Sequence, residues 1–189
     1  MSVTVRIILA VIVVGMGGVF LLVRKMSSKV VSDFKVSNPE GDEGIALVVY
    51  HPGISDFQRQ VNCAFADGLV SNGWRVEITT ASSQAPTDLS GYDLLVLGGP
   101  VYAGAVAQPV RSYLSGLGDL GGKRTVLIIS GSGSTDEAVS MMEKLVQEAN
   151  GDLVKSLPIW TQAPNEEMYG ISDPEEIMRQ AGTEIPLPD

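Results

Sequence analysis

Three short loops rich in glycine and serine carry the residue types that could bind a flat, phosphorylated ligand. They occupy residues 51–57, 98–108 and 131–135, and each follows an apolar segment and leads directly into an expected helix. Free N–H groups and the positive dipole end at a helix start favour a phosphate, and small residues let backbone approach a flat ring closely. We therefore expect phosphate binding after the first strand and ring binding between the second and third loops. The alternative is that these loops only make the tight turns of an α/β domain.

Apolar strand-like segments alternate with amphipathic helical ones along the chain, which predicts an α/β domain with a parallel sheet. The expected strands are Ile45–Tyr50 and residues 74–80, 93–97, 123–130 and 153–160. Most are nearly continuous in apolar residues, as in a sheet that helices cover on both faces. In a sheet ordered 2-1-3-4-5, the strands before the three loops are neighbours. The loops would then line one crevice at the carboxyl ends of the strands.

The segment YDLLVLGGPVYAGAVAQPVRSYLSGL, at residues 92–117, is the unit around which the others are arranged. It predicts a buried strand, a loop at residues 98–108, and a helix opened by Pro109, since proline suits the first helical position. The helix presents apolar residues at i, i+3, i+4 and i+7. Only residues 81–91 join the preceding strand to this one, which leaves room for at most one or two helical turns.

The N-terminal segment contains an uncharged apolar run at residues 7–23, at the short end of what spans a bilayer as a helix. A buried core helix and a cleaved signal peptide are the alternatives, but Arg24 and Lys25 follow the run and no small-residue cleavage site does. We expect a retained single-pass anchor. Arg24, Lys25 and Lys29 outweigh Arg6, which places the soluble domain in the cytoplasm by the positive-inside rule.

This organisation divides the chain into three parts. They are an N-terminal transmembrane anchor at residues 1–25, a juxtamembrane linker at 26–44 and one α/β domain at 45–189. The 189 residues suffice for one domain with a full-sized core plus one short extra segment.

Charge and cysteine content exclude several classes of function. Four of the 13 basic residues precede residue 30, so the rest of the chain holds 9 basic and 22 acidic residues, a net −13. Such an acidic domain argues against nucleic-acid binding, which needs clustered lysine and arginine, and suits a basic or weakly charged protein partner. Cys63 is the single cysteine, so no internal disulfide forms and no Cys/His pattern indicates a metal.

Other ligand classes on this topology lack their residues. The first strand is not followed by Gly-Lys-Ser/Thr, as a nucleotide triphosphate loop requires, and no dinucleotide-binding G-x-G-x-x-G is present. A phospho-acceptor receiver needs carboxylates at the ends of its first and third strands. Those ends are Tyr50-His51 and Gly98-Gly99 here.

The segments IALVVYHPGISDFQRQV, YDLLVLGGPVYAGAVAQPVRSYL and RTVLIISGSGSTDEA resemble the flavodoxin family. The resemblance covers about two-thirds of the chain, from residue 45 to about residue 160. Its most specific part is the strand–G-x-P-V-Y-x-G–helix run. It implies a flavodoxin-like three-layer fold with a five-stranded parallel sheet in the order 2-1-3-4-5, and the apolar run at residues 7–23 adds the expectation of one transmembrane helix before it. It also implies FMN as the cofactor and a role in carrying electrons or reducing a small acceptor.

The resemblance assigns FMN-binding residues in all three loops. The phosphate would lie against His51, Gly53, Ile54, Ser55, Asp56 and Phe57. The isoalloxazine ring would lie along Gly99, Pro100, Val101, Tyr102, Ala103 and Gly104, with the Tyr102 side chain stacked on it. Backbone groups of Ser130, Gly131, Ser132 and Gly133 would line the other edge of the ring.

The first loop departs from the flavodoxin pattern of several hydroxyls with a central Thr-Gly. It has Ser55 alone, and Pro52 donates no N–H, so other backbone amides and the helix dipole would carry phosphate binding. His51 could contact the phosphate, donate a proton to the reduced flavin, or have no role. Asp56 fits a helix cap better than a catalytic acid, and no residue stands out as catalytic.

Two functions follow as hypotheses. The first is a membrane-tethered FMN protein, anchored in the lipid bilayer by its N-terminal helix. It would exchange electrons with a redox protein or a quinone, and one form of this hypothesis is an FMN-dependent oxidoreductase. The second is a flavin-free binding or scaffold module that keeps the fold and uses its acidic surface against a partner.

Overall fold

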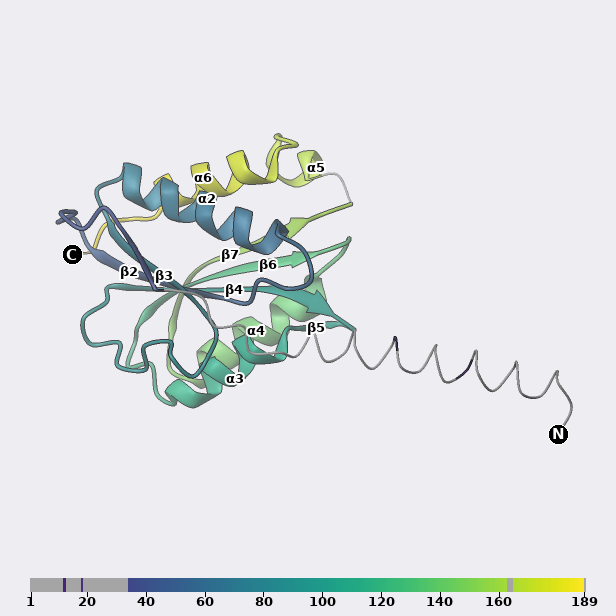
Figure 1. Cartoon of the computed structure of the whole chain (residues 1–189), viewed down its shortest axis with the longest axis horizontal. Coiled ribbons are helices and arrows are strands. Elements are labelled where there is room, and N and C mark those ends of the chain that lie inside the picture. Colours follow the sequence, from purple (N-terminus) through teal and green to yellow (C-terminus); the bar gives the residue numbers. More distant parts are fainter. Residues whose placement is uncertain (1–11, 13–17, 19–33, 163–164, 189) are drawn as a thin grey trace, which may run out of the picture.

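The computed structural model describes residues 12, 18, 34–162 and 165–188 of the chain. A central sheet lies between two layers of helices (Figure 1). The strands are β1 (Lys35–Ser37), β2 (Ile45–Tyr50), β3 (Arg75–Thr80), β4 (Leu94–Tyr102), β5 (Ala105–Val106), β6 (Arg124–Gly131) and β7 (Asp152–Trp160). The helices are α2 (Phe57–Ser71), α3 (Gln108–Leu117), α4 (Asp136–Glu148), α5 (Glu166–Tyr169) and α6 (Pro174–Thr183).

The flavodoxin-like α/β architecture predicted from the sequence is confirmed, but the strand count and order differ. Within the described residues the sheet has seven strands in the order β1-β3-β2-β4-β6-β7, with β5 beside β4. The five expected strands lie within it as β3-β2-β4-β6-β7 and pair in parallel. The two additional strands, β1 and β5, are antiparallel to their neighbours. The expectation of a purely parallel, five-stranded sheet is therefore wrong.

The two additional strands have different physical causes. β1 lies inside the segment expected to be a linker and pairs with β3, which covers a strand edge that would otherwise expose its N–H and C=O groups. β5 exists because the chain reverses after β4. Ala103 and Gly104 have φ of +49° and +80°, as both central residues of a tight hairpin turn require. Residues 98–102, expected to be a loop, thus extend β4, and residues 105–106 return along it.

The sheet buries side chains on both faces, since successive residues of a strand point to opposite sides. Ala46 and Val48 of β2 pack under α2 and α6, whereas Leu47 and Val49 pack with residues of α3 and α4. In α3 the expected apolar stripe is buried at Val110, Tyr113 and Leu114 and half-buried at Leu117. These two cores fix the strands whose carboxyl ends carry the three loops.

On one face, α2 and α6 approach each other so closely that backbone meets backbone. A Cβ atom added to Gly68 would lie 2.1 Å from the Arg179 carbonyl oxygen, and one added to Gly182 would lie 2.3 Å from the Phe65 carbonyl oxygen. The start of α6 is fixed by Asp173, whose carboxylate accepts the Glu175 N–H at 3.0 Å.

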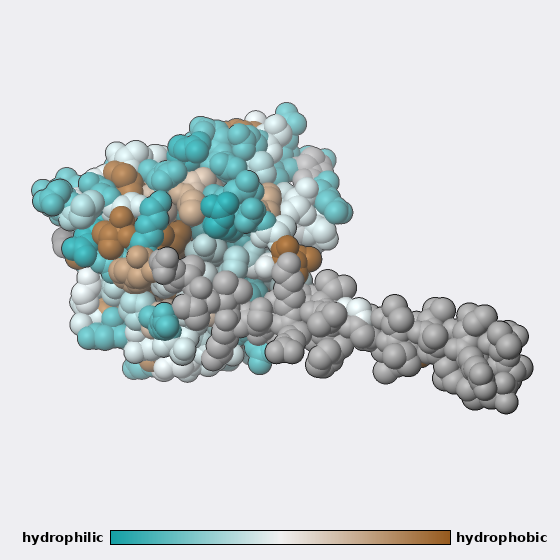
Figure 2. Space-filling view, in the orientation of Figure 1, coloured by the Kyte–Doolittle hydropathy of each residue, from teal (hydrophilic) through white to brown (hydrophobic). Residues whose placement is uncertain are grey.

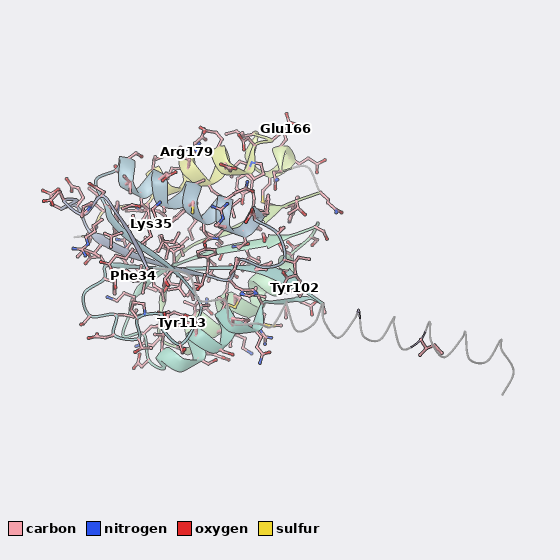
Figure 3. The ribbon with its side chains drawn as sticks, viewed as in Figure 1. Phe34, Lys35, Tyr102, Tyr113, Glu166 and Arg179 are labelled. Atoms are coloured by element: carbon pink, nitrogen blue, oxygen red, sulfur yellow. The ribbon has the colours of Figure 1, made fainter. Side chains whose placement is uncertain are left out.

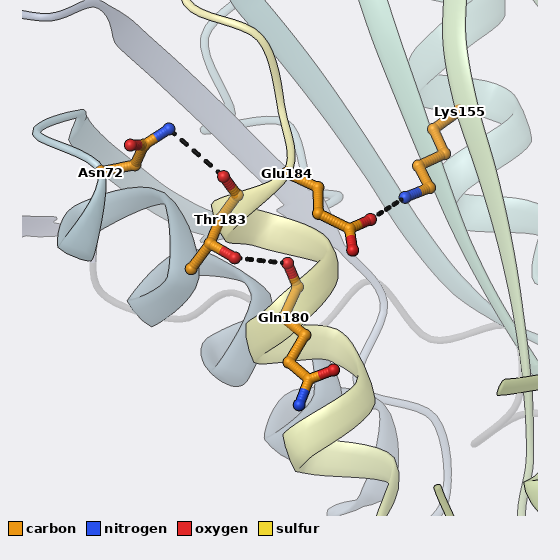
Figure 4. A network of polar contacts seen from close by, with 5 residues as sticks. All are labelled: Asn72, Lys155, Gln180, Thr183 and Glu184. Atoms are coloured by element: carbon orange, nitrogen blue, oxygen red, sulfur yellow. Dashed lines mark hydrogen bonds and ion pairs between the residues drawn. The ribbon is translucent and has the colours of Figure 1, made fainter. Parts of the chain in front are cut away.

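Polar contacts hold the other end of α6 (Figure 4). The Asn72 amide donates to the Thr183 carbonyl oxygen at 3.4 Å, and Lys155 of β7 pairs with Glu184 at 2.7 Å. These contacts therefore hold α2 to α6 and hold α6 to the sheet.

On the opposite face no helix joins β3 to β4, and an irregular segment at residues 81–93 covers β3 instead. Under it lies a buried carboxylate, Glu77, which is 7 % exposed. It accepts hydrogen bonds at 2.6 Å from both the Arg75 guanidinium and the Tyr92 hydroxyl. A polar cluster thus occupies part of the space that a helix would fill.

The predicted membrane localisation is contradicted. Within residues 12, 18, 34–162 and 165–188, no helix is both long and apolar enough to cross a bilayer. Apart from Ile12 and Gly18, the run at residues 7–23 lies outside the described residues. Figure 2 shows the described surface in this view as largely hydrophilic, with hydrophobic residues in small patches.

Candidate functional site

The carboxyl ends of β2, β4 and β6 meet at a groove with a volume of about 220 Å³. Strand pairing explains this meeting, because β2 and β6 flank β4 in parallel register. The lining residues come from the three loops, from the first turn of α2 and from the end of β7. They are Pro52, Gly53, Ile54, Ser55, Phe57, Gln58, Pro100, Val101, Tyr102, Ser130, Gly131, Ser132 and Thr161.

The first loop turns sharply and delivers the start of α2 to the groove. Gly53 has φ of +76°, which favours glycine, and a Cβ atom there would lie 3.1 Å from the Pro100 ring. Asp56 occupies the N-cap position of α2, but its side chain makes no capping hydrogen bond. Its carboxylate lies 3.4 Å from Arg59, and both side chains are mostly exposed. The amides of the first turn are therefore uncapped by Asp56, the arrangement that suits an anion at a helix start.

Tyr102, at the end of β4, reaches across to this loop. Its hydroxyl oxygen accepts the Ile54 N–H at 3.1 Å. Burial raises the pKa of Tyr102, and the hydrogen bond from Ile54 opposes that shift. The hydroxyl therefore stays protonated at neutral pH. Figure 3 shows Tyr102, at the end of β4, well apart from Tyr113 of α3.

A buried polar link joins the first turn of α2 to the end of β6. Gln58, 2 % exposed, donates from its amide to the Ile128 carbonyl oxygen at 3.1 Å and accepts the hydroxyl hydrogen of Ser130. One turn later, the Asn62 amide donates to the Gln58 carbonyl oxygen at 2.7 Å. The first and third loops are thus held in a fixed relation by side chains beneath the groove.

The third loop is fixed by β7. The Gly131 carbonyl oxygen accepts both the N–H and the hydroxyl of Thr161, at 2.8 and 3.3 Å. A Cβ atom at Gly131 would lie 2.4 Å from a methyl carbon of Thr135, so the close turn into α4 requires glycine. The Ser130 side chain is buried and committed to Gln58, which leaves its backbone to face the groove.

Most residues that the sequence assigned to the site meet at this groove. The predicted residues that line it are Gly53, Ile54, Ser55, Phe57, Pro100, Val101, Tyr102, Ser130, Gly131 and Ser132. The predicted residues that do not line it are His51, Asp56, Gly99, Ala103, Gly104 and Gly133.

His51 is the clearest departure among them. It is 1 % exposed, and its backbone N–H donates to the Gly98 carbonyl oxygen at 2.9 Å. This hydrogen bond continues the pairing of β2 with β4. Gly99 lies beneath the groove wall, where a Cβ atom would lie 2.8 Å from Val106.

The sequence reasoning missed Pro52, Gln58 and Thr161 as lining residues. Gln58 carried a readable signal, because it lies four residues before Asn62 and in phase with the apolar stripe of α2. Polar residues on the buried face of a helix must be hydrogen-bonded inside the protein. Thr161 follows β7 and has no comparable sequence signal.

Among the residues that the structure describes, the groove lining carries no ionisable side chain other than the Tyr102 phenol. Its walls are apolar and backbone surfaces, with a few hydroxyl and amide groups that can orient a ligand, as in most small-molecule sites. The arrangement can bind a flat, largely neutral group between Pro100–Tyr102 and residues 130–132. In the described part of the chain, its lining offers an anion backbone amides but no positive side chain.

Solved structures with the same architecture are flavodoxins and flavodoxin-like proteins. Oxidised flavodoxin 2 from Bacillus cereus has a TM-score of 0.60 and 21 % identity, covering 72 % of this chain and 94 % of that one. The fold is flavodoxin-like. The flavodoxin of Streptococcus pneumoniae TIGR4 has a TM-score of 0.59 and 18 % identity, over 74 % of this chain and 96 % of that one.

An azoreductase from Bacillus anthracis str. Sterne has a TM-score of 0.58 and 14 % identity, over 75 % of this chain and all of that one. No protein-family model and no curated protein sequence matches the chain. The similarity to flavodoxins therefore rests on the fold and on the three short sequence segments that resemble the family.

Proposed function

We propose that this chain binds FMN in the groove and carries electrons between a redox protein and a small acceptor, with quinones as the acceptor class. One observation carries the proposal. The three loops that resemble flavodoxin segments converge on a single groove of about 220 Å³ in a flavodoxin-like fold. Flavodoxins bind FMN, and ligands of open α/β sheets bind at the carboxyl ends of the strands.

The residues at the groove fit a flavin. The ring would lie between the β4 end, at Pro100–Tyr102, and the backbone of residues 130–132, where small residues permit close approach. The backbone amides at the start of α2 and the Ser55 hydroxyl would hold the phosphate. The close approach of Gly53 to Pro100 leaves no room for a side chain at this corner.

When bound, FMN supplies electron transfer in one- or two-electron steps. The chain would contribute binding, orientation and water exclusion, since Phe57, Pro100 and Val101 give the groove apolar walls. Because the Tyr102 phenol is the one ionisable group among the described lining residues, the protons taken up by a reduced acceptor would come from solvent. A neutral acceptor suits such a site better than a charged one, because no lining charge would pair with it.

The proposal is tested by titrating FMN with the full chain and measuring the quenching of flavin fluorescence. We expect saturable binding that Ser132→Trp abolishes, because an indole at this lining position would fill the groove. Ser115→Trp, at an exposed position on α3, is the matched control and should bind FMN like the unmodified chain. Absence of binding to the unmodified chain would overturn the proposal and favour a flavin-free binding module.

A further inference from the structure

The contact between Tyr102 and the first loop bears on which ligand the groove prefers. The Tyr102 hydroxyl oxygen accepts the Ile54 N–H at 3.1 Å, and a Cβ atom on Gly53 would lie 2.9 Å from that oxygen. The hydroxyl therefore lies directly against the part of the loop where a phosphate would need its donors.

The position of Tyr102 is set by backbone pairing. Tyr102 pairs with Ala105 and Val101 with Val106 in the hairpin of β4 and β5. The Ala107 N–H further ties the returning strand to the Pro100 carbonyl oxygen at 2.9 Å. Backbone pairing of the hairpin therefore fixes the place from which the Tyr102 side chain reaches the loop.

Apart from the backbone amides at the start of α2, the first loop offers a doubly charged phosphate few donors. Pro52 has no N–H, and Ser55 supplies the single hydroxyl of the loop. Asp56 adds a negative charge at the start of α2, where the helix dipole would otherwise favour the phosphate. Arg59 offsets this charge across 3.4 Å, but both side chains are exposed and the pair is screened by solvent.

We infer that Tyr102 determines ligand specificity at this groove. Its hydroxyl holds the place on the Ile54 N–H that a phosphate oxygen would take, so the site discriminates little between FMN and the phosphate-free flavin, riboflavin. A phosphate that binds the Ile54 amide must first displace the hydroxyl. This inference rests on the proposed flavin binding and specifies which part of the flavin is recognised.

Parallel titrations with FMN and riboflavin test the inference, using the full chain, Tyr102→Phe and the control Tyr113→Phe. Tyr113 also loses a hydroxyl hydrogen bond, to the Pro86 carbonyl oxygen, but lies away from the groove. We expect the unmodified chain to bind the two flavins within about ten-fold of each other. In Tyr102→Phe the preference for FMN should rise roughly five-fold, the worth of one typical hydrogen bond. Tyr113→Phe should leave the ratio unchanged.

Three results would contradict the inference while leaving flavin binding intact. They are a strong FMN preference in the unmodified chain, an unchanged ratio in Tyr102→Phe, and a ratio that falls because the hydroxyl helps to bind the phosphate. Failure of every variant to bind either flavin would overturn the proposed function and the inference with it. Amide exchange in ligand-free protein gives a separate readout: the Ile54 N–H should exchange faster in Tyr102→Phe, and an unchanged rate would contradict the inference.

Discussion

The two faces of the sheet are built differently, although both bury apolar strand residues. On one face, α2 and α6 touch through Gly68 and Gly182, and the first turn of α2 is linked to β6 by Gln58. On the other face, an irregular segment takes the place of a helix, and Glu77 is buried beneath it. The first face positions the start of α2 and hence the first loop. Stability and site geometry should therefore be most sensitive to changes on that face.

The largest effect is expected at the helix contact. In Gly68→Ala the new Cβ atom would lie 2.1 Å from the Arg179 carbonyl oxygen, so α2 and α6 must move apart. Overpacking of this kind typically costs about 1–3 kcal/mol, and we expect the upper part of that range because backbone cannot rotate away. Urea denaturation measures the change. An unfolding midpoint equal to that of the unmodified chain would show that the two helices are not rigidly fixed.

The buried link under the groove should come next. Gln58→Ala removes the amide that donates to the Ile128 carbonyl oxygen and the amide oxygen that accepts the Ser130 hydroxyl. Buried polar groups left unsatisfied cost about 1–3 kcal/mol. We expect a loss of about 2 kcal/mol in urea denaturation. Gln60→Ala, an exposed position on the same helix, is the control and should change stability by less than about 0.5 kcal/mol. Equal effects of the two substitutions would show that the hydrogen bonds of Gln58 do not stabilise the fold.

On the opposite face, Tyr92→Phe deletes the hydroxyl that donates to Glu77 at 2.6 Å. Arg75 still pairs with the same carboxylate at 2.6 Å, so the charge keeps a partner. We expect a loss of about 1 kcal/mol, below that of Gln58→Ala, in the same denaturation experiment. A loss larger than that of Gly68→Ala would reverse the contrast between the faces.

The smallest effect is expected from repeating the glycine substitution on the second face. Gly116 is an exposed residue of α3, and a Cβ atom there would meet nothing within 4 Å. Alanine is a better helix former than glycine, so Gly116→Ala should stabilise the chain by roughly 0.5 kcal/mol. Thermal unfolding compares it with Gly68→Ala, and destabilisation by both would mean that neither face tolerates the change.

The sequence predicted the elements whose residues follow a strong pattern. The apolar runs at Ile45–Tyr50 and in β4 and β6 each appear where expected. β1 could not be predicted, because three half-polar residues form a strand only when an open edge such as that of β3 is available. The hairpin after Tyr102 was missed because alanine rarely adopts positive φ, as Ala103 does here.

The candidate site was predicted at the level of loops and less well at the level of side chains. Topology alone brings the ends of β2, β4 and β6 together, so the convergence of the loops follows from strand order. Whether a side chain then faces the groove depends on register. His51 pairs its backbone with Gly98 and is buried, and Ser130 turns toward Gln58. Neither orientation can be read from residue types.

Mapping FMN onto the chain by changes in backbone amide chemical shifts tests the proposed flavin site most directly. We predict that the largest shifts fall at residues 53–58, 101–102 and 130–132 and at Thr161, since Pro52 and Pro100 have no amide hydrogen. We predict small shifts around the separate hollow near α3 that Ala81, Ser82 and Tyr113 line. Shifts centred on that hollow, or no shifts with excess FMN, would contradict the claim that the three loops form a flavin site.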